Sequence, residues 1–321
     1  GGNAMSRTLS RLLQLPSIAV LLVWMLVPLS MTLYFSFRKY HLLRPHIQSW
    51  AGFKNYQNFI FARKGKGWVW ELEFLDFLNV QWLTDLAIAT PFATSFVTVI
   101  GNTLILVGSV LFITVVFGLA ISVLVNREFA GRGIVRVMLI SPFFIMPAVN
   151  GIIWKNMMFD PIYGLINVLW TMFGAEPVPW LERYPLQGII TMVAWQWTPF
   201  AILIFMTSLQ SEDREQHEAA RLDGANFIQI FLLLTLPHLA RAIAVVILIQ
   251  MIFHLGVFAE ILISTKGGPG SASATLTYEI YKKALEGFNY GLAAAGGVLA
   301  IILANLVSIF LVRFVGDNLA E

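Results

Sequence analysis

Residues that could carry out covalent chemistry are scarce in this sequence of 321 residues. There is no cysteine, which excludes disulfides, thiolate catalysis and cysteine-bound metals. No GxSxG nucleophile motif and no GxxxxGKS/T phosphate-binding loop occurs, so any ATP chemistry must come from another chain. No HExxH or other metal-binding spacing is found among the histidines, which are His41, His46, His217, His238 and His254. The sequence therefore predicts no catalytic residue, no metal site and no cofactor in this chain.

One charged segment interrupts the otherwise apolar second half of the chain. Glu218, Arg221 and Asp223 fall close together, and Gly224 follows them. We expect a short helix that ends at Asp223 and Gly224, because glycine readily adopts the left-handed conformation of a helix stop. A helix of about ten residues is marginal in isolation. Either it docks into a groove on a partner, or it belongs to a solvated linker.

The flanks of this short helix predict its start and a second helix after it. Asp213 can cap the first helix, with Gln216 three residues further on as in a capping box. The second helix is expected over residues 226–236, and Pro237 is expected to interrupt it before the next apolar run. We interpret residues 211–238 as a helix–turn–helix that lies parallel to the membrane.

Polar and aromatic side chains share one face of the apolar run at residues 239–263. Four residues spaced i, i+3, i+4 and i+7 share one helical face: Gln250, Phe253, His254 and Val257. Polar groups are costly against lipid, so this face should line a solute pathway or meet another helix. Hydrogen bonding between helices recruits the same residue types, and both interpretations stay open.

The fourth apolar run carries a similar set of side chains around Pro199. Because proline has no N–H, it breaks the backbone ladder and can expose carbonyls to a cavity. The candidates for solute contact are Trp195, Gln196, Trp197 and Phe200. Aromatic faces stack on sugar rings and glutamine can bond hydroxyls, which favours a carbohydrate-like solute.

The third run offers three further candidates for the solute pathway, Phe143, Phe144 and Asn150. A phenylalanine at such a position is more often part of helix packing than a platform for a solute. Pro142 and Pro147 bracket this region and predict a distorted helix.

These groups belong to a chain that is too apolar for water. Hydrophobic residues make up 58% and charged residues 12%, whereas soluble domains carry roughly 25% charged residues. The mean hydropathy is +0.75. A net charge of +3 is mild and indicates no nucleic-acid partner. The composition predicts an all-α membrane protein whose surrounding is the lipid bilayer.

Six apolar stretches are long enough to cross a bilayer, which needs about 20 residues in a helix. Their centres are essentially free of carboxylates. They cover residues 16–37, 94–125, 134–158, 186–209, 239–263 and 292–315. We therefore expect a polytopic bundle of six spans, and the even number places both termini on one side.

The remaining segments complete the expected organisation. Gly1 to Ala4 precede a methionine and resemble a cloning remnant, so residues 1–15 comprise this remnant and a cytoplasmic N-terminus. Residues 38–93 form an aromatic extracytoplasmic loop, which either folds into short structure or lies in the lipid headgroups. Residues 94–315 form the core with five spans, and residues 316–321 a cytoplasmic tail.

The distribution of basic residues bears on the orientation of the termini. Outside the long loop, Lys and Arg are more numerous on the side of the termini, which favours a cytoplasmic location for both ends. Arg38 and Lys39 directly follow the first span and argue against a cytoplasmic location of the termini.

The charged segment carries a family resemblance. Its sequence EAARLDGANFIQIFLLLTLP resembles the EAA signature of binding-protein-dependent ABC importer permeases: Glu-Ala-Ala, three residues, Gly, nine residues, Ile, one residue, Leu-Pro. Leu234 departs from the usual isoleucine. The positions that match the signature are Glu218, Ala219, Ala220, Gly224, Leu236 and Pro237.

Three further segments extend the resemblance over most of residues 16–315. RVMLISPFFIMP and GIIWKNMMFDPIYGLIN are similar to the third-span region of carbohydrate-type permeases. AGFKNYQNF resembles their segment after the first span. STKGGPGSASATLTYEIYKKAL resembles the segment before their last span, and its GGP is similar to the F-type subunit of maltose-type permeases.

The resemblance implies a fold and a set of partners. The fold would be that of type I ABC importer permeases, with a cytoplasmic EAA coupling helix. The partners would be a second homologous permease, two cytoplasmic ATPase subunits that bind ATP and Mg²⁺, and a periplasmic solute-binding protein. Glu218 would meet a basic residue of the ATPase and Gly224 would permit the turn. The other coupling residues would be Ala219, Ala220, Asp223 and Pro237, and the helices flanking the loop would line the solute cavity.

The resemblance implies an ATP-driven importer of the bacterial inner membrane that accepts a carbohydrate, neutral or acidic such as alginate fragments. The alternative is a self-contained secondary transporter or channel for a small polar solute. The near absence of carboxylates from the spans counts against coupling to protons or sodium. A membrane-bound enzyme is a third possibility, weakened by the lack of acid, base and nucleophile clusters.

Overall fold

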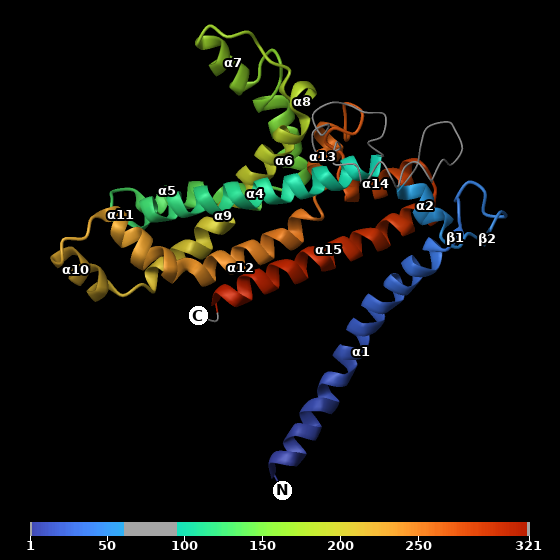
Figure 1. Ribbon diagram of the computed structural model, residues 1–321, viewed down its shortest axis with the longest axis horizontal. Coiled ribbons are helices and arrows are strands. Elements are labelled where there is room, and N and C mark those ends of the chain that lie inside the picture. The colour runs from blue at the N-terminus through green and yellow to red at the C-terminus, as the bar shows by residue number, and fades with distance from the viewer. Residues whose placement is uncertain (1, 61–94, 320–321) are drawn as a thin grey trace, which may run out of the picture. The chain divides into compact units, whose positions relative to one another are not determined.

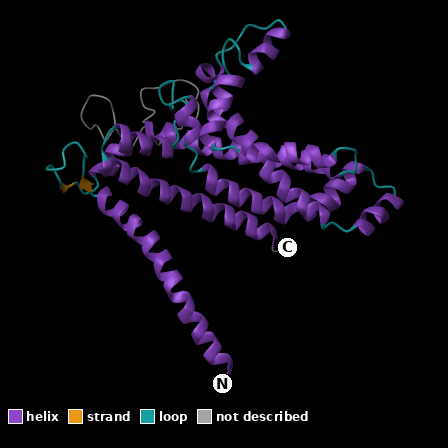
Figure 2. Ribbon diagram, turned by 180° about the vertical axis from the view of Figure 1, so that it is seen from behind, coloured by secondary structure: helices purple, strands orange, loops and turns teal. Residues whose placement is uncertain are grey.

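The computed structural model describes residues 2–60 and 95–319. Helices dominate these residues (Figure 2), because a backbone in lipid must satisfy its hydrogen bonds within its own segment. In the described part of the chain, the one sheet pairs β1 (Arg38–Lys39) with β2 (Ser49–Trp50), antiparallel. The prediction of an all-α membrane protein is confirmed.

The chain divides into two compact units. The first comprises Gly1–Thr94 and Ile280–Ile302, and the second comprises Ser95–Glu279 and Leu303–Glu321. The first unit holds α1 (Gly2–Ser36), the β1–β2 ribbon, α2 (Lys54–Ile60) and the start of α15 (Tyr290–Leu319). Of the loop predicted at residues 38–93, the part up to residue 60 forms short structure, and residues 61–94 lie outside the described residues.

The second unit is built around three long helices, α4 (Ser95–Asn126), α9 (Pro185–Gln210) and α12 (Leu236–His254). They lie together in Figure 1, and Ala201, Phe205 and Val246 form a buried cluster between them. A Cβ at Gly118 of α4 would lie 2.8 Å from the Cβ of Ala201, so this position needs glycine for the close approach of α4 to α9.

The third predicted span is sharply bent. Arg132–Phe144 and Pro147–Met158 meet at 105°. The first arm is α5 (Arg132–Ile140) with the short 3₁₀ turn Ser141–Phe144, and the second is α6 (Pro147–Ile153) with the π turn Trp154–Met158. Met146 is extended, as the residue before proline prefers. The distortion predicted between Pro142 and Pro147 is confirmed.

A projecting segment with α7 (Leu165–Met172) and α8 (Trp180–Arg183) joins this bent pair to α9. Asn167, which is 1% exposed, ties the segment together. Its side-chain amide donates to the carbonyls of Asp160 and Val178, and its oxygen accepts from the indole of Trp180 at 2.9 Å. In Figure 1, this segment projects upward from the side of the α4, α9 and α12 bundle.

The fifth predicted span, residues 239–263, is wrong at both ends. The continuous apolar helix runs over Phe227–His254 and includes α11 (Phe227–Ile230), the π turn Phe231–Thr235 and α12. After a break come α13 (Ala259–Ser264), α14 (Leu276–Tyr281) and the π turn Lys282–Glu286. Glu260 would lie near the exposed outer end of a span over residues 239–263. In the structure it belongs to α13 and is 3% exposed.

The remaining predicted spans agree with helices to within a few residues. The apolar helices are Leu13–Ser36, Phe96–Asn126, Pro185–Gln210 and Tyr290–Phe310. Together with Phe227–His254 they make five candidate spans among the described residues, or six when the bent pair counts as one. The six-span prediction therefore holds if the bent pair crosses the membrane.

Candidate functional site

Helix α10 (Arg214–Leu222) begins at a side-chain cap. The carboxylate of Asp213 accepts a hydrogen bond of 2.9 Å from the backbone N–H of Glu215, which satisfies an orphan donor at the helix start. The predicted cap is confirmed, but no bond from Gln216 back to Asp213 is found among the described hydrogen bonds.

The end of α10 is a Schellman motif centred on Gly224, which has a φ of 87°. The N–H of Ala225 donates to the carbonyl of Ala220 at 3.0 Å, and the N–H of Gly224 to that of Arg221 at 3.1 Å. A side chain at Gly224 would be strained in this left-handed backbone. The predicted stop at Asp223 and Gly224 is confirmed.

Residues 211–238, with α10 and α11 (Phe227–Ile230), are called the EAA loop below. A capping box starts α11. Asn226 accepts from the N–H of Gln229 at 2.9 Å, and the side chain of Gln229 accepts from the N–H of Asn226 at 2.8 Å. The prediction that Pro237 interrupts this helix is wrong. A π turn, closed by the N–H of Leu236 on the carbonyl of Phe231, carries the chain into α12, where Pro237 occupies the first turn and its missing N–H costs little.

One contact holds α10 against the turn before it, and another joins the end of the loop to α9. The imidazole of His217 lies 2.8 Å from the carboxylate of Glu212, in the turn after α9. The imidazole of His238 lies 3.0 Å from the carbonyl of Ser208 at the end of α9. Of the two, only the contact of His238 reaches the helix that precedes the loop.

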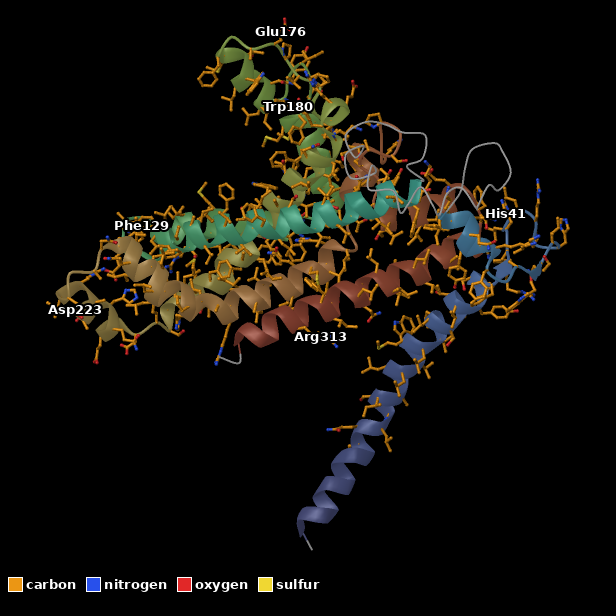
Figure 3. The ribbon with its side chains drawn as sticks, viewed as in Figure 1. His41, Phe129, Glu176, Trp180, Asp223 and Arg313 are labelled. Atoms are coloured by element: carbon orange, nitrogen blue, oxygen red, sulfur yellow. The ribbon has the colours of Figure 1, made fainter. Side chains whose placement is uncertain are left out.

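The outer surface of the EAA loop is bare. Glu218, Ala219 and Asp223 are exposed, and Leu222 is 89% exposed. In Figure 1, α10 and α11 lie at the left end of the bundle, and Figure 3 shows Asp223 at the tip of this end. A charged helix with an exposed leucine at its end has the chemistry of an element that docks into a partner's cleft.

A buried polar network links the three central helices. Gln250 is fully buried; its oxygen accepts from Thr114 of α4 at 2.7 Å, and its nitrogen donates to the carbonyl of Trp197 at 3.2 Å. His254 lies 3.4 Å from the same oxygen, while its Nδ1 is buried and has no partner among the described residues. Helix-to-helix bonding therefore accounts for Gln250.

A second buried amide pair lies at the bend of the third span. The Asn150 side chain donates to Gln196 at 2.9 Å and to the carbonyl of Met192 at 3.1 Å, and Gln196 donates to the carbonyl of Ile145. The Ile145 carbonyl belongs to the break between the two arms. The Asn150 oxygen has no partner among the described residues. This pair ties the break to α9.

Aromatic side chains from three elements gather beside these networks. The ring of Trp197 lies 5.5 Å from Phe143, 5.8 Å from Phe200, 5.1 Å from Phe253 and 5.0 Å from His254. We call Phe143, Trp197, Phe200 and Phe253 the aromatic cluster. Phe253 is 59% exposed, so the cluster reaches the surface of this chain.

The other predicted pathway residues are dispersed. Trp195 points away from the aromatic cluster, toward Trp154, at a ring distance of 5.7 Å. Phe144 contacts Phe143 but is 76% exposed. Val257 does not share a helical face with Gln250 as predicted, because α12 ends at His254 and Val257 lies in the break that follows.

Sequence reasoning missed several residues that organise the site. Thr114 gave no signal because it occurs in an apolar helix far from Gln250 in sequence. Asn102 of α4 donates to the carbonyls of Ser271 at 2.9 Å and Ala274 at 3.1 Å, and so anchors the loop that contains the GGP segment. Leu222, the last residue of α10, is 89% exposed, and it was not among the predicted coupling residues.

The sequence profile described as "binding-protein-dependent transport system inner membrane component" matches residues 3–320. The chain belongs to this family. Its members are inner-membrane components by that description, which agrees with the apolar helices found here. The predicted relationship to ABC importer permeases is confirmed.

Two relatives and one solved structure illustrate the similarity. A probable ABC transporter permease, y4oQ of Sinorhizobium fredii, is 38% identical over 60% of this chain, an alignment that spans 62% of that relative. The trehalose/maltose transport system permease MalF of Thermococcus litoralis is 27% identical over 92% of this chain and 89% of its own length. A bacterial ABC transporter described as importing the acidic polysaccharide alginate has a subunit with a TM-score of 0.72, 20% identity and coverage of 98% and 97%. That neighbour establishes the permease fold of ABC importers for this chain.

Proposed function

We propose that this chain is a transmembrane subunit of an ATP-driven importer that passes a carbohydrate from a binding protein to the cytoplasm. The observation that carries the proposal is the exposed α10, which is capped at both ends and lies in the loop between α9 and α12. Membership of the binding-protein-dependent family supports it.

In this proposal, α10 docks into a cleft of a cytoplasmic ATPase, and a second permease subunit completes the pathway. Glu218 contacts a basic residue of the ATPase, and Leu222 fills an apolar pocket beside it. ATP and Mg²⁺ are held by the ATPase subunits, and the EAA loop and both termini lie in the cytoplasm. When the ATPase closes, α10 moves, and the motion passes through the turn at Glu212 and the contact between His238 and Ser208 to α9 and α12, which carry the polar networks.

The aromatic cluster is our candidate contact for the solute. Partly exposed aromatic rings provide flat apolar faces for sugar rings, and relatives such as the trehalose/maltose permease support a carbohydrate. His254, whose Nδ1 has no partner among the described residues, contacts Trp197 of this cluster, and Asn150, whose oxygen likewise has none, bonds the adjacent Gln196. Unsatisfied buried polar groups cost about 1–3 kcal/mol each, so we expect them to gain partners when the bundle changes conformation.

The decisive experiment reconstitutes the chain with its second permease, ATPase and binding protein in liposomes. We expect ATP-dependent uptake, with ATPase activity stimulated by binding protein loaded from a panel of neutral and acidic sugars. Uptake by this chain alone, without an ATPase or nucleotide, would favour the self-contained transporter instead.

Paired variants test the solute contact within the same system. Phe253→Ala should raise the sugar concentration at half-maximal uptake several-fold, because it removes one ring of the aromatic cluster. Phe112→Ala, on an exposed face of α4, is the matched control and should leave this concentration unchanged. Equal behaviour of the two variants would remove the aromatic cluster from the pathway.

A further inference from the structure

A pocket of about 720 Å³ lies in the first unit, where the chain leaves α1 and where α15 begins. This volume is within the range of small-molecule sites. The described residues that line the pocket are Lys39, Tyr40, His41, Arg44, Ile47, Lys54, Asn55, Gln57, Asn58 and Asn289. Figure 3 shows His41 in this region. The pocket does not overlap with the EAA loop or with the aromatic cluster.

The charge of this pocket is one-sided. Lys39, Arg44 and Lys54 contribute three cations, and no carboxylate is among the described residues that line the pocket. None of the three has an ion-pair partner within the described part of the chain. The Nδ1 of His41 is buried and likewise has no partner there. Such an arrangement favours a ligand with oxyanion groups, which accept charge-assisted hydrogen bonds.

The frame of the pocket is held independently of these cations. The buried Asn55 side chain donates to the carbonyls of Ser36 and Arg38, both at 2.8 Å. The backbone of His41 pairs with that of Asn289, which joins the segment after α1 to the start of α15. A site whose frame does not depend on its charged groups is preorganised, and its charges can be changed without unfolding it.

The surroundings indicate the level of a membrane surface. α1 ends at Ser36 and α15 begins at Tyr290, so the ends of two apolar helices meet here. Aromatic rings are concentrated at the same level, as they are in membrane–water interfaces: Phe35 with Tyr40, Phe37 with Trp50, Phe53 and Tyr56, and Tyr40 with Tyr290.

Exposed apolar side chains adjoin the cations of the pocket. Leu43 is 66% exposed, Ile47 is 52% exposed and Phe53 is 70% exposed. A soluble anion would gain nothing from these side chains. A lipid would place its acyl chains against them and its charged headgroup against the cations.

We propose that this pocket binds the phosphate headgroup of an anionic glycerophospholipid in the leaflet next to the ends of α1 and α15. Lys39, Arg44 and Lys54 neutralise the phosphate, and the amides of the lining contact the glycerol hydroxyls. The bound lipid anchors the first unit at the membrane surface. The same phosphate chemistry could come from free glycerol phosphate, and the experiment separates these two sources.

The test is native mass spectrometry of the full-length chain in detergent, titrated with phosphatidylglycerol, phosphatidylcholine or soluble glycerol 3-phosphate. We expect one tightly retained phosphatidylglycerol. Each cation near an anionic lipid surface strengthens binding about fivefold, so Lys39→Gln, Arg44→Gln and Lys54→Gln together should weaken retention on the order of a hundredfold. Phosphatidylcholine should bind weakly, and it should bind equally to the unmodified chain and to this triple variant.

Two further variants test whether binding depends on the positive charges of this pocket in particular. The charge-conserving set Lys39→Arg, Arg44→Lys and Lys54→Arg should keep most of the binding. The matched control replaces three exposed cations outside the pocket, Arg241, Lys266 and Lys282, by glutamine and should bind like the unmodified chain. An unchanged melting temperature in the pocket variant shows that its frame remains folded.

Three outcomes would overturn the proposal. Equal retention of phosphatidylglycerol by the pocket variant and the matched control would exclude the pocket as a lipid site. Retention of glycerol 3-phosphate as tight as that of the lipid would identify a free anion as the ligand. A pocket variant that keeps its lipid but loses stimulation by binding protein, in neutral and anionic vesicles alike, would assign these cations to an acidic protein surface.

Discussion

The EAA loop and the buried amide pairs of the bundle place polar groups in opposite environments. On the loop, Glu218 is exposed, and the cap at Asp213 bonds a residue only two positions away. In the bundle, Gln196 is 4% and Gln250 0% exposed. Their partners Asn150 and Thr114 lie 46 and 136 residues away in sequence.

This difference separates two roles for polar residues in one chain. The loop is shaped by local hydrogen bonds and leaves its outer surface free for a partner. In the bundle, the polar side chains form hydrogen bonds between helices, because an unpaired amide is costly in a medium without water. Changes to the loop should therefore impair transport without lowering stability, whereas changes to the amide pairs should lower stability first.

The largest effect is expected from Glu218→Arg combined with Gly224→Val. The first change reverses a charge on the exposed face of α10, and the second strains the left-handed turn by about 1–2 kcal/mol. We expect uptake by the reconstituted importer to fall at least about a hundredfold while the chain stays folded, because the strain is confined to the turn after α10. Glu215→Gln, exposed on the same helix, is the control. Normal uptake by the double variant would show that the loop is not the coupling element.

Gln196→Leu should have the next largest effect, on stability. It removes the side-chain acceptor of Asn150, which keeps its bond to the carbonyl of Met192, and it leaves the carbonyl of Ile145 without its donor; an unsatisfied buried group costs about 1–3 kcal/mol. Thermal unfolding in detergent, followed by tryptophan fluorescence, should show a loss of about 3 kcal/mol. Thr191→Val, on an exposed face of α9, should be nearly neutral. A loss no larger than that of the control would mean that the bend does not depend on this pair.

Glu260→Gln tests a buried carboxyl through its pH dependence. Burial raises the pKa of Glu260 to about 7, from an ordinary value of 4.5. Between these values the folded chain keeps a proton that the unfolded chain has released. The free energy of unfolding should therefore fall as the pH rises, by about 2 kcal/mol between pH 5 and pH 7, and level off above.

The Glu260→Gln variant has no carboxyl at this position and should show a flatter pH profile over this range, measured by chemical denaturation in detergent. Parallel profiles for the two proteins would contradict the burial of an ionisable group in α13.

Asn226→Ala is expected to have the smallest effect. It removes the capping box at the start of α11, which contributes about 1 kcal/mol to that helix. We expect uptake to fall a few-fold, with no change in the melting temperature of the bundle. Gln216→Ala, at the position where the sequence predicts a box and the structure has none, should leave uptake unchanged. A larger loss from Gln216→Ala would reverse the assignment of the two caps.

The EAA loop was predictable because the hydrogen bonds that shape it join residues close together in the sequence. Asp213, Asp223 and Gly224 act on backbone groups within a few residues of themselves, so their order along the chain specifies the helix stop and the first cap. The apolar runs were predictable for a related reason, since a bilayer requires long helices. The π turn before Pro237 was not, because whether a proline ends a helix or enters its first turn depends on the hydrogen bonds of the residues before it.

By itself the sequence determined the all-α class, the positions of most spans and the EAA loop. Only the tertiary structure decided which polar residues meet: Gln250 with Thr114, Asn150 with Gln196, and Trp197 with its aromatic neighbours but Trp195 with Trp154. The physical reason is that a helix offers every side chain a defined direction, but the partner found there depends on how distant helices cross. That crossing is set by close contacts such as Gly118 against Ala201, which no local pattern in the chain records.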